Sequence, residues 1–146
     1  MEKKRDLKDD RSIFAYIVLG LLTCGIYNIW VLYGLANDVN LICKDYGKRT
    51  TSAITLVVLS LLTFGLYAVF WWVRLADMLG YAARKRNLNV SVSGGFILAC
   101  MVLNYLVCGI ASWVGVHKIF EVSNELANDY NMELRRRPEL FENEEN

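Results

Sequence analysis

His117 is the only histidine in this 146-residue chain, and two glutamates follow it at helical spacing. His117, Glu121 and Glu125 fall at i, i+4 and i+8, so a helix would place them on one face. Such a trio is the one group in the sequence that could hold a metal ion or move a proton. A solvated charge pair at i, i+4 explains the same spacing more simply. We therefore predict no catalytic residue, metal or cofactor.

The cysteines and the basic residues add no further chemistry. Cys24, Cys43, Cys100 and Cys108 show no C-x-x-C spacing, and three of them lie in apolar stretches, where cysteine acts as a small hydrophobic residue. The lysines and arginines form no stripe interleaved with exposed aromatic residues, so nucleic acid is not expected as a partner.

The charged residues are distributed very unevenly. No Asp, Glu, Lys or Arg occurs in residues 12–37, 52–73 or 87–116, and 55% of the chain is hydrophobic. A bilayer core of about 30 Å needs roughly 20 helical residues to cross it. This pattern predicts an all-α membrane protein. Its parts are a charged N-terminal segment (1–11), a membrane domain (12–137) with apolar segments at about 12–36, 53–73 and 95–116, and an acidic disordered tail (138–146).

The chain also repeats itself. The stretch LLTCGIYNIW at residues 21–30 returns as LLTFGLYAVF at residues 61–70, and a fainter copy, VCGIASW, stands at residues 107–113. We expect three repeats of about 40 residues, a period typical of repeated supersecondary units. An amphipathic helical extension should follow each apolar segment. Its apolar face is formed by Leu35, Val39, Ile42 and Tyr46 in the first repeat, by Leu75, Met78 or Leu79, and Ala82 in the second, and by Ile119, Val122, Leu126 and Tyr130 in the third.

The repeated Thr-x-Gly-x-Tyr element has the residue types of a helix-packing motif. Small residues let membrane-buried helices approach closely, and threonine can bond along or between helices. We predict this packing role for Thr23, Gly25, Tyr27, Thr63, Gly65, Tyr67 and Gly109. Binding of an ion or a lipid headgroup at an opened glycine backbone is the alternative.

Asn28 and Asn104 are the most polar residues within the apolar segments. A buried amide without a partner is costly, so each is expected to bond across helices. In an oligomer the same amides could line a narrow pore.

Two topologies fit the three apolar segments. Lysine and arginine near the segment ends favour three single spans with a cytoplasmic N-terminus. In the alternative, each repeat is a hairpin that enters and leaves on the cytoplasmic side and turns at TCG, TFG or VCG. We favour the single spans.

The stretch SIFAYIVLGLLTCGIYNIWVLYGLANDVN and its second copy resemble small bacterial membrane proteins of the family called domain of unknown function 4234. The resemblance covers roughly residues 11–130 and implies a bacterial integral membrane protein without assigned chemistry. The function we expect is that of a non-enzymatic packing or scaffold module in a multi-pass cell-membrane protein. Its expected partners are the lipid bilayer and either a second copy or another membrane protein. A small oligomeric pore, or a lipid-binding and membrane-perturbing protein, is the alternative.

Overall fold

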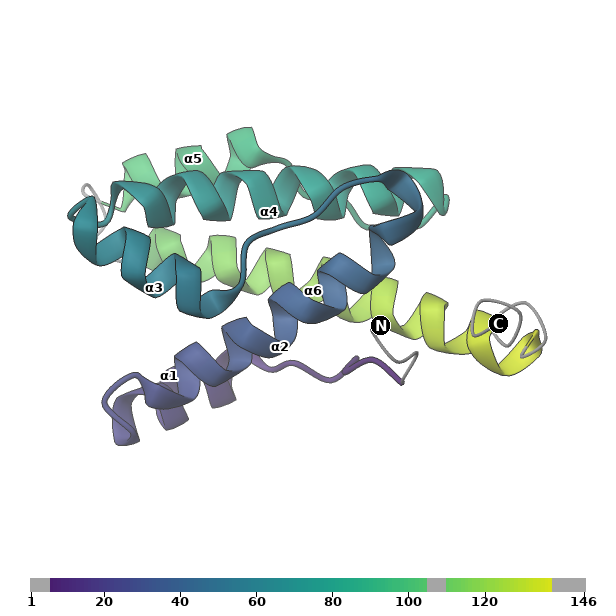
Figure 1. Cartoon of the computed structure of the whole chain (residues 1–146), viewed down its shortest axis with the longest axis horizontal. Coiled ribbons are helices and arrows are strands. Elements are labelled where there is room, and N and C mark those ends of the chain that lie inside the picture. The colour runs from purple at the N-terminus through teal and green to yellow at the C-terminus, as the bar shows by residue number, and fades with distance from the viewer. Residues whose placement is uncertain (1–5, 105–109, 138–146) are drawn as a thin grey trace.

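The computed structural model describes residues 6–104 and 110–137, and in these residues all regular structure is helical. The helices pair into three hairpins, which the chain forms one after another (Figure 1). In chain order the elements are α1 (Ile13–Leu22), α2 (Ile26–Ile42), a short 3-10 turn η1 (Lys44–Tyr46), α3 (Ala53–Leu62), α4 (Leu66–Lys85), α5 (Gly94–Leu103) and α6 (Ile110–Arg136).

Each hairpin has a short first arm and a longer second arm. A serine stands at the N-cap of every short arm, namely Ser12, Ser52 and Ser93, and the last two hydroxyls accept backbone N–H groups of the first turn. Gly25 and Gly65 end the turns of the first two hairpins with φ of 89° and 88°, a left-handed conformation that glycine adopts without strain. The turns of the first two hairpins, the C-terminal end of α5 and the N-terminal end of α6 lie toward the same end of the molecule, at the left in Figure 1.

The long arms α2, α4 and α6 pack together and form the core at the opposite half of the molecule. Their predicted apolar faces are confirmed except at Tyr46, which is half-buried and lies in η1, since Leu35, Val39, Leu75, Leu79, Ile119 and Leu126 are each fully buried. We call this half the base. The charged residues of the long arms also lie in the base, and none occurs near the turns.

The predicted membrane-spanning fold is wrong. None of the helices in the described residues combines the length and the apolar character that crossing a bilayer requires. The positive φ of Gly25 and Gly65 breaks an apolar segment that reads as one long helix into a 10-residue arm and a second helix that soon becomes charged. The three spans, the multi-pass cell-membrane location and the cytoplasmic N-terminus inferred from them are therefore not supported.

The chain instead reverses at TCG and TFG, where the alternative hairpin topology places its turns. The third predicted turn, at VCG, and the acidic tail 138–146 lie outside the described residues.

Candidate functional site

The turn ends of the three hairpins carry large apolar side chains that face outward. We call these ends the tips. The exposed residues on them are Leu21, Leu22 and Ile26 in the first hairpin, Leu61, Leu62, Phe64 and Leu66 in the second, and Val102, Leu103 and Ile110 in the third. Phe64 is the extreme case, with 98% of its surface exposed. Apolar patches of this kind on a folded chain usually mark a binding surface.

The first tip satisfies its own backbone. The N–H groups of Thr23, Cys24, Gly25 and Ile26 donate to carbonyls of the same turn. The Thr23 hydroxyl donates to the Leu19 carbonyl at 2.6 Å, while its oxygen accepts the N–H of Tyr27 at 3.0 Å. One threonine thus joins the last turn of α1 to the first turn of α2, so the reversal needs no water molecule for these groups.

The second tip repeats this threonine bridge, but among the described residues the Phe64 N–H has no hydrogen-bond partner. The Thr63 hydroxyl donates to the Leu59 carbonyl at 2.7 Å and accepts the N–H of Tyr67 at 3.0 Å. The N–H of Gly65 donates to the Ser60 carbonyl at 2.7 Å, as a left-handed helix end requires. The repeated Thr-x-Gly-x-Tyr element is therefore a helix-reversing turn.

The glycines of this element do not pack against another helix of this chain. A Cβ added at Gly25 or Gly65 would meet nothing within 4 Å. Gly20 is the close-packed glycine of the first hairpin, because a Cβ there would lie 2.1 Å from the Asn28 side-chain oxygen. Packing of Gly25 and Gly65 against a second molecule stays a prediction, and Gly109 lies outside the described residues.

Aromatic residues follow the tips along the long arms, and charged residues follow the aromatic ones. In α2 the order is Ile26, then Tyr27 and Trp30, whose ring centroids are 5.9 Å apart, then Asp38. In α4 it is Leu66, Phe70, Trp71 and Trp72, then Arg74, and in α6 it is Ile110, Trp113, then His117 and Lys118. From tip to base, each hairpin therefore passes from apolar through aromatic to charged side chains.

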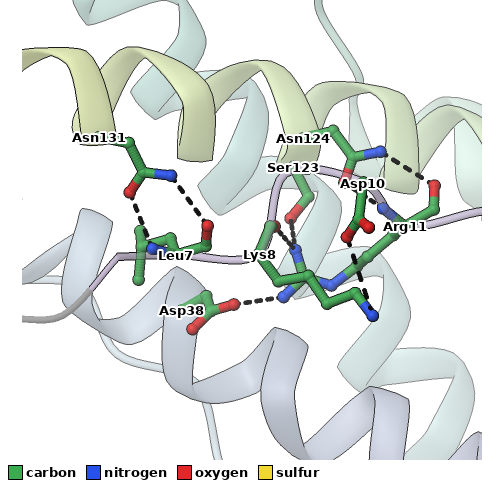
Figure 2. Close-up of polar contacts among 8 residues, drawn as sticks. All are labelled: Leu7, Lys8, Asp10, Arg11, Asp38, Ser123, Asn124 and Asn131. Carbon is green, nitrogen blue, oxygen red and sulfur yellow. Dashed lines mark hydrogen bonds and ion pairs between the residues drawn. The ribbon is translucent and has the colours of Figure 1, made fainter.

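The N-terminal segment closes the base from one side, an arrangement the sequence analysis missed. The Asn131 side-chain amide exchanges two hydrogen bonds with the backbone of Leu7, at 2.8 and 2.9 Å, and Asn124 does the same with Arg11, at 3.1 and 2.9 Å. These two clamps lie side by side along α6 (Figure 2). The seven-residue spacing of the two asparagines on one helix face is the sequence signal for them.

The same segment carries a buried ion pair. The Arg11 guanidinium contacts the Asp38 carboxylate, and both side chains are less than 5% exposed. Arg11 also donates to the Lys8 carbonyl at 2.6 Å and to the Ser123 hydroxyl at 3.3 Å (Figure 2). Its charge is therefore fully engaged inside the protein.

The side-chain amides of Asn28 and Asn104 were predicted to form hydrogen bonds between helices. The side-chain oxygens of Asn28 and Asn104 are buried without a hydrogen bond among the described residues. Asn28 lines a cavity of about 260 Å³ between the hairpins, together with Trp72, Ser112 and Trp113. The predicted bonds across helices are therefore not formed in this structure, and the pore stays a prediction.

The histidine trio is not assembled into a metal site. Glu121 pairs with Lys118 at 2.8 Å. Within residues 6–104 and 110–137, no three His, Cys, Asp or Glu side chains converge as metal ligands. Cys24 is exposed near the first tip, while Cys43 and Cys100 are buried.

These features define a class of helical-hairpin protein with a packed base and three uncharged apolar tips. The chain belongs to the family described as domain of unknown function 4234, whose model matches residues 11–79 and again residues 52–125. The first match runs from α1 into α4 and the second from α3 into α6, so each covers most of two successive hairpins, and the resemblance to the family seen in the sequence is confirmed. No curated protein and no solved structure matches the chain.

Proposed function

We propose that this protein is a non-enzymatic module that binds a lipid bilayer from one side by inserting its three tips. The observation that carries the proposal is the shared direction of the tips, each with large exposed apolar side chains and no charge. Burying one such leucine or phenylalanine in hydrocarbon contributes about 1.5–3 kcal/mol. Three tips that enter together add these contributions.

The length of the short arms fits one leaflet. Helices α1, α3 and α5 have 10 residues each, which corresponds to about 15 Å. The hydrocarbon core of a bilayer is about 30 Å thick, so arms of this length reach its middle without crossing it.

Most backbone N–H groups at the first two turns are hydrogen-bonded, which suits hydrocarbon. An unpaired backbone group costs several kcal/mol there, and non-helical backbone is tolerated only where its polar groups are satisfied or shielded. Thr23 and Thr63 provide the bonds that a turn in water could leave to solvent.

The order of side chains along the molecule also favours lipid over a second protein. Apolar tips, aromatic side chains such as Trp30 and charged side chains such as Arg74 follow one another in the order of hydrocarbon, interface and headgroups. The scaffold role predicted from the sequence remains compatible with this attachment as a further prediction.

Flotation of the full-length protein with phosphatidylcholine vesicles tests the proposal. Wild-type protein should float with the vesicles, and Leu22→Asp combined with Phe64→Asp should remain in the dense fraction. Leu22→Met with Phe64→Leu is the matched control and should float. A dye attached to Cys24 should shift its emission to the blue on binding. The proposal is wrong if wild-type protein fails to float, or if the double aspartate variant floats equally well.

A further inference from the structure

The first hairpin contains an open cleft, whereas a side chain fills the equivalent space in the second hairpin. It has a volume of about 440 Å³ and lies between α1, α2 and the N-terminal segment. In the repeat alignment Val31 corresponds to Trp71. Trp71 is 1% exposed, and its indole N–H donates to the Thr51 carbonyl at 3.2 Å, so an indole occupies this place in the second hairpin. Val31 is smaller and leaves the space open.

The walls of the cleft are aromatic. Tyr27, Trp30 and Tyr33 of α2 line it on one side, and Tyr16 and Phe120 lie deeper. Trp30 and Tyr33 are themselves exposed, so the cleft opens at the aromatic level between tip and base. The Lys8 ammonium lies 5.8 Å from the centroid of the Trp30 ring, so this ring can hold a cation and Lys8 occupies that place in this structure.

The rim offers one exposed ammonium group, that of Lys8, and two exposed carboxylates, those of Asp6 and Asp10. Lys8 and Asp10 are 3.8 Å apart and well exposed, so their mutual attraction is weak and both remain accessible to a ligand. Arg11 also lines the cleft, but its guanidinium is already bonded to Asp38, Ser123 and the Lys8 carbonyl. The accessible charges are therefore one ammonium and two carboxylates beside aromatic faces.

From this chemistry we infer that the cleft binds the headgroup of one phospholipid that carries both a phosphate and an ammonium group. Lys8 leaves the Trp30 ring and donates to the phosphate, and the headgroup ammonium takes its place against the Trp30 and Tyr27 rings near the Asp6 and Asp10 carboxylates. Aromatic faces with a nearby carboxylate are the surroundings that alkylammonium groups prefer. The inference rests on the proposed function, because it names the lipid whose bilayer the tips enter.

Titration calorimetry with dihexanoylphosphatidylcholine, kept below its micelle concentration, tests this inference on the full-length protein. Val31→Trp should weaken binding by about tenfold or more, since the indole fills the space as Trp71 does in the second hairpin. Val114→Trp is the matched control, because Val114 is exposed on α6 outside the cleft, and it should bind like wild type. Circular dichroism should show that both variants keep their helices.

Asp10→Asn keeps the inference falsifiable if Val31→Trp does not fold, because Asp10 is exposed on the rim. This variant should weaken phosphatidylcholine binding but leave the weaker binding of dihexanoylphosphatidylglycerol unchanged. Equal wild-type affinity for the two lipids, or unchanged binding by Val31→Trp and Asp10→Asn, would overturn the inference. Flotation separates the two proposals. A wild-type protein that floats but does not bind the short-chain lipid refutes only the cleft, whereas binding without flotation refutes only tip insertion.

Discussion

The base and the tips are built from the same three hairpins, but the base buries its apolar side chains and the tips expose theirs. In the base, apolar side chains such as Leu75 are fully buried, and the charge of Arg11 is matched by Asp38. At the tips, apolar side chains such as Leu61 face outward, and the Thr63 hydroxyl bonds to backbone groups on both sides of its turn. Folding is therefore complete in the base without a partner, while the tips expose the surface that a partner would cover. Stability and binding should depend on different halves of the molecule.

The strongest test of this division removes the buried anion of the base. Asp38→Ala leaves the Arg11 guanidinium uncompensated inside the protein, and we expect a loss of about 3–5 kcal/mol in the free energy of unfolding. Urea denaturation measures the loss. Asp45→Ala, which removes an exposed carboxylate near the same helix end, should change stability by about 0.5 kcal/mol or less. Similar losses for the two variants would show that the buried ion pair does not stabilise the base more than an exposed carboxylate does.

A matched pair of leucines compares the two halves directly. Leu75→Ala creates a cavity in the base and should cost about 2–5 kcal/mol. Leu61→Ala, at an exposed position on the second tip, should change stability by about 0.5 kcal/mol or less but weaken vesicle binding. Urea denaturation and flotation measure the two effects. An equal loss of stability at Leu61 would mean that the tip is packed in solution.

Raising the pH should weaken the base through Cys43. Burial raises the pKa of the Cys43 thiol from 9.0 to about 11, against smaller opposing effects of Lys48 and Arg86. Between these values the unfolded chain loses the thiol proton and the folded chain keeps it, so stability is intact below pH 9 and falls as the pH rises toward 11. The loss should reach at most about 3 kcal/mol.

Tyr16 extends the same trend to higher pH, because burial raises its pKa from 10.0 to about 12. Because Cys43→Ala removes the thiol that titrates between pH 9 and 11, its urea midpoints between pH 8 and 11 should fall less steeply than those of wild type. Cys24→Ala, at an exposed position near the tip, should follow the wild-type curve. If the urea midpoint of Cys43→Ala falls with pH as steeply as that of wild type, the loss of stability does not come from the Cys43 thiol.

The smallest effect in solution is expected for the turn hydroxyls. Thr23→Val together with Thr63→Val removes two side-chain bridges, and since water can replace them, stability should fall by about 1 kcal/mol per site or less. In hydrocarbon no water replaces them, so vesicle binding should fall much more. Serine at both positions should restore flotation. Unchanged flotation of the valine variant would show that the turns remain in water.

Much of the base could be predicted from the sequence. The spacing of Leu35, Val39 and Ile42, and that of Ile119, Val122 and Leu126, predicts the buried faces of α2 and α6 because side chains three and four apart share a helix face. The spacing of Asn124 and Asn131 places them on one helix face, but their partners could not be recognised, because these are backbone groups more than 100 positions away.

The sequence by itself determined the helical class, the repeated units and the uncharged character of the tips, since these depend on local spacing and composition. Only the tertiary structure decided that each apolar segment folds back on itself. In a sequence, a glycine in an apolar segment is compatible with a close helix contact and with a left-handed turn. The choice at Gly25 and Gly65 depends on how the long arms pack in the base, which holds each short arm beside its own partner. The open cleft beside Val31 likewise depends on the tertiary structure, because the N-terminal segment packs next to the first hairpin and forms one side of the cleft.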